Sequence, residues 1–219
     1  MGRSAIAKDD RDGLRSRVGW QWWTGAWVIL GLAAGFSAAI SAQDTENLPP
    51  GIRKTEQGYL HVASQFELRP SKDWLVKSPE LVQKFPAFSL RRRLPGQEKE
   101  AVEVSITLVP MGELPLQEIV QQELQVLQLI YGAKMVGEAE EVDLATQPPR
   151  KGYRILLQDG PSRNGREAGV VYLFATGDDP KTAWRVRVRA SWNKPATKEA
   201  AAEVEKLLPS LHIVQQEGQ

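Results

Sequence analysis

The sequence EAGVVYLFATGDDPKTAWRVRVRASW (residues 167–192) has the pattern of a β-hairpin, and it decides the fold. Two runs rich in apolar residues flank a turn segment, 177–180, that contains Gly, two Asp and Pro. The first run, 170–175, is apolar at every position, which is typical of a strand covered on both faces. The second run alternates between two faces of a strand, with Trp184, Val186, Val188 and Ala190 on one face and Arg185, Arg187 and Arg189 on the other. We therefore predict this hairpin at the centre of a sheet against which the other elements pack.

Two segments upstream alternate in the same way. In AVEVSITLV, residues 101–109, the apolar face consists of Val102, Val104, Ile106 and Leu108. In FSLRRRL, residues 88–94, Phe88 is predicted to point inward and Arg91 and Arg93 outward. Shorter strands are predicted at 59–62, 66–69, 134–142, 153–158 and 211–214.

Two segments have helical periodicity. In PLQEIVQQELQVLQLIY, residues 115–131, apolar residues recur at helical spacing, Pro115 stands at the start and Gly132 follows the end. Its Gln-rich face is expected to face solvent. A second helix is predicted at 196–208, with Thr197 as its N-cap. Neighbouring antiparallel strands with helices left to cover the sheet predict the α+β class.

The composition excludes several classes of function. The 219 residues are 25% charged and 42% hydrophobic, which is ordinary for a globular domain, and the net charge of +1 provides no field for nucleic acid. There is no cysteine, so disulfides, thiolate chemistry and cysteine metal sites are excluded. Only His61 and His212 are present, which also excludes a His-rich metal site within one chain. We predict no cofactor and no metal.

Residues 20–42, WQWWTGAWVILGLAAGFSAAISA, carry no charge and follow a segment with five Lys/Arg and three Asp. A signal peptide cut after Ala42 fits the basic start, the apolar centre and the small residues before Gln43. An uncleaved membrane anchor fits the length and the tryptophans near its start. Cleavage is the interpretation we favour. Either way, the basic flank predicts that the rest of the chain is exported: periplasmic, secreted, or anchored by this segment.

The remaining chain divides into three parts. Residues 43–57 are polar, include Pro49, Pro50 and Gly51, and are predicted to be a linker. A single domain is predicted at 58–214, and 215–219 form a tail. Together with 1–42 as signal peptide or anchor, this is the expected organisation of the chain.

Six segments, taken in order, have a recognisable arrangement: 66–74 (FELRPSKDW), 101–108, 115–131, 153–158, 170–192 and 196–211. This order of elements resembles the PsbP/Mog-like superfamily, and the resemblance covers roughly 58–214. It implies an α/β/α sandwich with a central, mostly antiparallel sheet and two main packing helices, here preceded by an N-terminal hydrophobic helix. It also implies a binding or scaffold module without a known enzymatic site.

The alternating arginines, Arg185, Arg187 and Arg189, form what we call the arginine ladder. One interpretation is a binding site for an acidic partner, which Arg91 and Arg93 would join if their strand lies nearby. The other, which we favour, is a solvated sheet face paired with carboxylates of neighbouring strands, such as Glu103 or Glu167.

Aromatic and titratable residues supply the other candidates. Trp74 and Trp192 either line a ligand groove or fill the core, and the core is favoured. A hydrolytic dyad would pair His61 or His212 with a nucleophile, but no motif connects either histidine to Ser64, Ser210 or Asp73.

Calcium is a further possibility for the acidic loops at 159–164 and 178–179. No loop has the EF-hand spacing, and turn chemistry accounts for these Asp, Asn and Gly residues.

Taken together, the sequence predicts an exported, non-enzymatic binding or scaffold domain of the cell envelope. The expected partner is an acidic protein or another envelope component and not nucleic acid, with membrane contact through 20–42 if that segment is uncleaved. The alternatives are an envelope hydrolase with an unrecognised site and a carrier of a small ligand between sheet and helix.

Overall fold

The computed structural model describes residues 48–94, 97–129, 132–159, 167–193 and 197–214. The hydrophobic segment 20–42, most of the predicted linker, most of the acidic loop at 159–164 and the tail 215–219 lie outside the described residues. Within the described ranges, neither helix has both the length and the apolar character needed to cross a membrane.

The described strands form two sheets, and every pairing between them is antiparallel. The smaller sheet has the order β1-β2-β3-β13, with β1 (Ile52–Lys54), β2 (Tyr59–His61), β3 (Phe66–Leu68) and β13 (Leu211–Ile213). The larger sheet has the order β4-β6-β7-β12-β11-β10-β8, with β5 on β6 and β9 on β10. Its strands are β4 (Leu75–Val76), β5 (Glu80–Val82), β6 (Phe85–Leu94), β7 (Gln97–Pro110), β8 (Lys134–Met135), β9 (Glu140–Leu144), β10 (Arg150–Asp159), β11 (Glu167–Ala175) and β12 (Trp184–Asn193).

The predicted hairpin lies at the centre of the larger sheet. Strand β12 pairs with β11 on one side and with β7 on the other, so Val188 lies between Tyr172 and Ile106. Val186 and Val188 are fully buried, as their alternation with the arginines predicted. The hairpin is therefore confirmed as the element on which the sheet is built.

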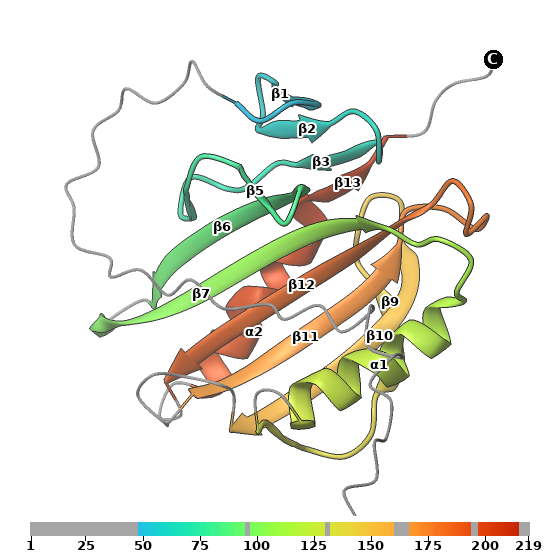
Figure 1. Ribbon diagram of the computed structural model, residues 1–219. Helices are drawn as coiled ribbons and strands as arrows, with labels where there is room; N and C mark the ends of the chain where they lie inside the picture. Colours follow the sequence, from blue (N-terminus) through green and yellow to red (C-terminus); the bar gives the residue numbers. More distant parts are fainter. Residues whose placement is uncertain (1–47, 95–96, 130–131, 160–166, 194–196, 215–219) are drawn as a thin grey trace, which may run out of the picture. The chain divides into compact units, whose positions relative to one another are not determined.

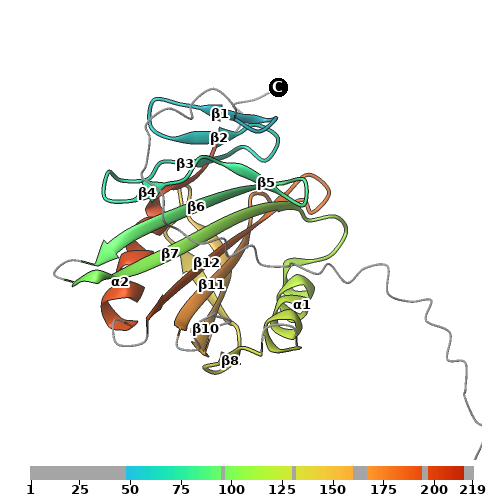
Figure 2. The same cartoon turned by 60° about the vertical axis from the view of Figure 1, so that its left-hand side comes forward.

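The two helices, α1 (Leu116–Leu129) and α2 (Thr197–Leu207), pack on opposite faces of the larger sheet (Figures 1 and 2). One apolar cluster joins α2 and the smaller sheet to the face that carries Val186. A second joins Val120 and Leu127 of α1 to Ile155 of β10 on the other face. Helix α1 ends at Leu129, and Gly132, which was predicted to follow the helix, has a φ of +61° that suits glycine.

The fold thus belongs to the α+β class, with mostly antiparallel sheet and two helices. Two predicted boundaries are wrong. Strand β1 lies within the predicted linker, and Ile52 is buried in the core, so ordered structure begins before Gly58. The segment 134–142 is two short strands, β8 and β9, separated by a turn in which Gly137 has a φ of +77°.

Replacing Val188 with Asp should destabilise the domain by about 3–5 kcal/mol, because the carboxylate would be an uncompensated charge in the core. Urea unfolding followed by circular dichroism measures the change. The control is Ser105→Asp on the neighbouring strand β7, where the side chain is exposed. Equal unfolding midpoints for the two variants would contradict the assignment of the buried face.

Candidate functional site

The arginine ladder lies on the face of the sheet that α1 covers. A terminal nitrogen of Arg187 is 2.6 Å from Oε1 of Glu123 on α1, and their side chains are only 13% and 9% exposed. Burial lowers the pKa of Arg185 below its ordinary value, and Arg187 adds to this effect while Glu123 opposes it. The favoured expectation of a solvated face paired with strand carboxylates is therefore wrong at Arg187, because its partner comes from the helix.

The other predicted cations are separated from the ladder. Arg91 lies on β6, and β7 runs between β6 and β12. Glu103 of β7 stands opposite Arg91, and the two side chains are 3.8 Å apart and exposed. Arg93 is also exposed. The structure therefore does not bring the five arginines together into one site.

An equivalent ion pair lies on the opposite face of the sheet, where Arg92 of β6 points toward α2. Its terminal nitrogen is 2.7 Å from Oε2 of Glu203, whose side chain is 7% exposed. Its guanidinium also lies 5.9 Å from the centre of the Trp74 ring. Sequence reasoning missed Arg92, although alternation places it on the same face of the strand as the buried Phe88, Leu90 and Leu94.

Trp74 and Trp192 are both buried and belong to the apolar cluster beneath α2. This agrees with the favoured interpretation that they fill the core. Trp74 also borders a shallow cleft beside α2, with a volume of about 470 Å³. The cleft is lined by Arg69, Ser71, Asp73, Trp74, Arg92, Lys206, Leu207, Pro209, Ser210 and His212. Its three cations are each paired with a carboxylate: Arg69 with Glu67, Arg92 with Glu203, and Lys206 with Glu203.

The structure does not arrange His212 as a catalytic base. The Ser210 hydroxyl, the nearest candidate nucleophile in sequence, donates to the backbone carbonyl of Leu207 at 2.6 Å and so closes the end of α2. Burial and the nearby Arg69 lower the pKa of His212, with Glu67 opposing. The arrangement is that of a strand histidine beside an ion pair.

His61 does contact a serine: its Nδ1 lies 2.7 Å from Oγ of Ser64. Both residues are buried, and the backbone N–H of Ser64 also donates to Nδ1 in the turn between β2 and β3. The ring packs edge-on against Trp184, with the ring centres 4.8 Å apart. Burial lowers the pKa of His61. No described carboxylate orients the imidazole, and the hydroxyl is not open to a substrate, so the contact stabilises a turn.

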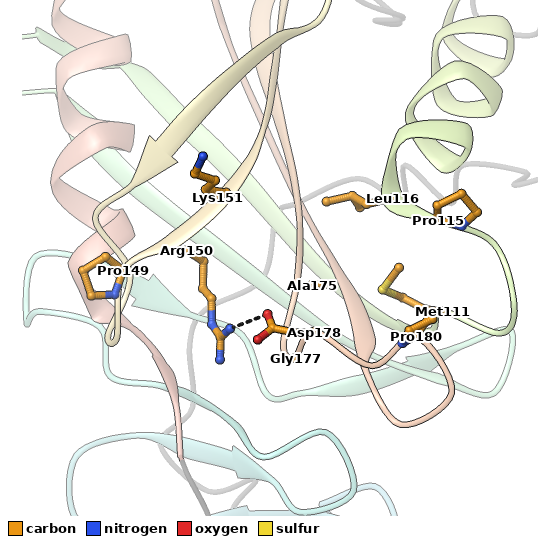
Figure 3. A pocket seen from close by; sticks show the side chains of 10 residues that line it. All are labelled: Met111, Pro115, Leu116, Pro149, Arg150, Lys151, Ala175, Gly177, Asp178 and Pro180. Atoms are coloured by element: carbon orange, nitrogen blue, oxygen red, sulfur yellow. Dashed lines mark hydrogen bonds and ion pairs between the residues drawn. The ribbon is translucent and has the colours of Figure 1, made fainter.

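A larger pocket, which we call the end pocket, lies where three loops meet at one end of the larger sheet (Figure 3). Its volume is about 520 Å³. It is lined by Met111, Pro115, Leu116, Pro149, Arg150, Lys151, Ala175, Gly177, Asp178 and Pro180. These residues come from the loop between β7 and α1, the start of β10 and the turn between β11 and β12. Sequence reasoning missed this site.

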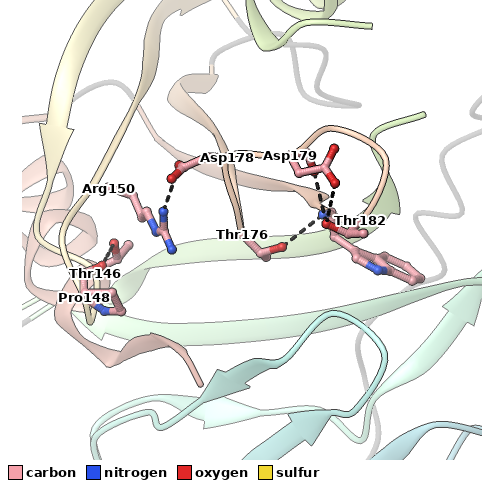
Figure 4. Close-up of polar contacts among 8 residues, drawn as sticks. Thr146, Pro148, Arg150, Thr176, Asp178, Asp179 and Thr182 are labelled. Carbon is pink, nitrogen blue, oxygen red and sulfur yellow. Dashed lines mark hydrogen bonds and ion pairs between the residues drawn. The ribbon is translucent and has the colours of Figure 1, made fainter. Parts of the chain in front are cut away.

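The two neighbouring aspartates at the β11–β12 turn have different roles (Figure 4). Asp179 supports the turn: its Oδ1 accepts from the backbone N–H of Lys181 at 3.0 Å, and its carbonyl accepts from Ala183 at 2.8 Å. Asp178 instead points toward Arg150, with Oδ1 3.3 Å from a terminal nitrogen. The turn-chemistry interpretation is thus confirmed for Asp179. No group of three or more potential metal ligands occurs among the described residues.

No family model matches the chain, and no curated protein matches it in sequence. The structure is similar to the crystal structure of LpqN, which is involved in cell envelope biogenesis of Mycobacterium tuberculosis. The TM-score is 0.50 and the sequence identity is 12%, over 68% of this chain and 83% of that chain. A likeness at this identity concerns the fold alone. Membership of the PsbP/Mog-like superfamily is not shown by these comparisons.

Replacing Glu123 with Gln should destabilise the protein by about 3–5 kcal/mol, because Arg187 would remain buried without its counter-charge. Urea unfolding gives the free energy of unfolding. The double variant Glu123→Gln/Arg187→Gln should lose less than the sum of the two single variants, because it leaves neither partner of the pair as an unpaired charge.

The matched control is Glu103→Gln, which breaks the exposed pair with Arg91 and should cost at most about 1 kcal/mol. Equal losses for Glu123→Gln and Glu103→Gln would mean that the helix is not held by a buried ion pair.

Proposed function

We propose that this protein is an exported, non-enzymatic binding domain of the cell envelope that uses the end pocket to hold its ligand or partner. The pocket itself carries the proposal. It combines an apolar wall with two cationic side chains, which is the composition expected of a binding site. It is built from loops on a rigid sheet, the usual position of functional residues.

The proposal of binding without catalysis rests on the arrangement of reactive groups in the described part of the chain. The histidine that contacts a serine does so in a buried turn, and neither histidine lines the end pocket. A covalent or acid–base mechanism needs a nucleophile or base that faces a substrate. The end pocket offers two cations, apolar contacts and one carboxylate, Asp178, which is engaged with Arg150, and this combination favours binding over turnover.

Export and envelope association have separate support. The uncharged segment 20–42 follows a basic flank and has the pattern of a signal peptide or an anchor. The structurally similar LpqN is involved in cell envelope biogenesis. We further propose that the chain is a distant member of the PsbP/Mog-like α/β/α sandwiches, which is consistent with the packing of α1 and α2 on opposite faces of an antiparallel sheet.

Two other binding sites, an apolar cavity under α1 and the arginine ladder, have less support than the end pocket. A carrier with an apolar cavity under α1 would need space that the Glu123–Arg187 pair and its neighbours occupy. An acidic partner on the ladder would have to compete with Glu123. Acidic or anionic chemistry remains our expectation for the partner, with Arg150 and Lys151 as its contacts in place of the ladder.

Export is tested by expressing the full chain with an unmodified N-terminus in a bacterial host, followed by fractionation and intact mass. We expect the protein in the envelope, either as a soluble species that begins at Gln43 or as an uncleaved species in the membrane. Full-length protein recovered from the cytoplasm alone would overturn the proposed location.

Binding is tested with the ¹⁵N-labelled protein from that expression and a panel of small neutral, anionic and cationic fragments. We expect amide shifts at Met111, Leu116, Ala175 and Gly177 for members of the panel. Gly177→Trp should abolish them by filling the pocket, since an added Cβ there meets only Ala183 at an ordinary 3.8 Å.

Gly177→Ala is the matched control and should retain binding. A panel that leaves these amides unshifted, or shifts that persist in Gly177→Trp, would overturn the end pocket as the binding site.

A further inference from the structure

We infer that the end pocket takes an anionic amphiphile, a molecule with a carboxylate or phosphate group at one end and an apolar body, and that the anionic group binds Arg150. This rests on the proposed function and specifies the chemical class of the ligand.

Arg150 has few hydrogen-bond partners in the described part of the chain. Its side chain is only 20% exposed, and its one polar contact within the described residues is the 3.3 Å approach to Asp178. Its Nε is buried and has no hydrogen-bond acceptor. A guanidinium carries five N–H donors in a planar fork that matches a carboxylate or phosphate with two parallel bonds. Because the Nε is buried, the donors that a ligand can reach are those of the two terminal nitrogens, whose one contact within the described residues is with Asp178.

The partner that Arg150 has is easily displaced. The Asp178 side chain is fully exposed, so water screens the ion pair and can solvate the carboxylate when it leaves. The turn does not depend on Asp178, because Asp179 and Thr176 make its hydrogen bonds. The Asp178 carboxylate thus stands where the anionic group of the ligand would bind and competes with it.

The opposite wall of the pocket supplies the apolar contacts. Figure 3 shows Met111, Leu116 and Pro115 on the side away from Arg150, with Asp178 between the two sides. Leu114, which precedes Pro115 in the same loop, is among the exposed large apolar residues. A purely ionic ligand would leave this wall unused, and a purely apolar one would give Arg150 no acceptor beyond the exposed Asp178.

Lys151 brings a second positive charge to the pocket, which also favours an anionic ligand. It lines the pocket beside Arg150 and is largely exposed, with Glu141 of β9 at 3.6 Å. Its flexible ammonium can follow a bound anion, whereas Arg150 is held by the surrounding chain. The charge of the pocket is therefore set by two cations and one weakly held carboxylate.

The test measures dissociation constants by isothermal titration calorimetry with four probes that share an eight-carbon chain: octanoate, octyl phosphate, octyltrimethylammonium and octanol. Each is used below its micelle concentration or solubility limit. Acetate and inorganic phosphate are the probes without an apolar body. We expect octanoate and octyl phosphate to bind at least about tenfold more tightly than every other probe, as a charged hydrogen bond and apolar burial each contribute. The stronger of the two indicates whether a carboxylate or a phosphate is the natural group.

Three variants locate the anion. Arg150→Gln should weaken octanoate binding by about tenfold or more. Asp178→Asn should strengthen it by about threefold, because the competing carboxylate is lost from an exposed turn position. Arg53→Gln removes the same charge from an exposed position on β1 and should leave the affinity unchanged. Asp178→Asn does not touch the core, so it tests the proposal even if Arg150→Gln folds poorly.

Several outcomes would overturn this inference. Octanol binding as tightly as octanoate would remove the anionic requirement, and inorganic phosphate matching octyl phosphate would remove the apolar one. Weaker octanoate binding by Asp178→Asn would mean that Asp178 is not a competitor. In each of these cases the fragment shifts at the end pocket would remain, so the proposed function would stand. Its own failure would appear as the absence of those shifts.

Discussion

Two buried ion pairs, one on each face of the larger sheet, determine how the helices of this protein are placed. Glu123 of α1 meets Arg187 of β12, and Glu203 of α2 meets Arg92 of β6, with nitrogen–oxygen distances of 2.6 and 2.7 Å. Each glutamate lies in the middle of its helix's buried stripe, among apolar residues. A carboxylate in that position needs a counter-charge, which Glu123 finds on the sheet and Glu203 finds both on the sheet and at Lys206 of its own helix.

We interpret these pairs as devices that specify arrangement more than they add net stability. Apolar residues of similar volume can often replace a buried ion pair without loss of stability, whereas removal of one partner is costly. An amphipathic helix with a purely apolar stripe can slide or rotate on a sheet at little cost. A single glutamate within the stripe permits only the position in which it reaches its arginine. The position of α1 matters for function because Pro115 and Leu116, at its start, form one wall of the end pocket.

Much of the fold could be predicted because alternation and helical periodicity are local signals. The buried face of β12 and the limits of α1 follow from the residues themselves. The helical partner of Arg187 does not, because pairing between a helix and a strand is a tertiary contact. A signal for it was nevertheless present. Glu123 falls four residues after Ile119 and four before Leu127, so it lies on the apolar face of the helix. Arg92 alternates with its neighbours so that it lies on the buried face of β6. A charge on a predicted apolar face indicates a buried partner on another element.

The end pocket was beyond sequence reasoning for a different reason. Its residues lie in three loops at 110–116, 149–151 and 175–180, and no local pattern shows that these loops meet. The predicted sites relied on residue type alone, which does not distinguish the two ways in which this protein uses arginine. Arg187 and Arg92 have buried carboxylates within ion-pair distance, so their charge is already compensated inside the fold.

Arg150 is the contrasting case, since its one partner within the described chain is a carboxylate in water. The exposure of the carboxylate partner therefore separates Arg187 and Arg92, whose counter-charges are buried, from Arg150, whose counter-charge lies in water at the mouth of a pocket. By that criterion, Arg187 in the central strand is structural. The cation at the edge of the loops, which carries no sequence motif, is the better candidate for binding.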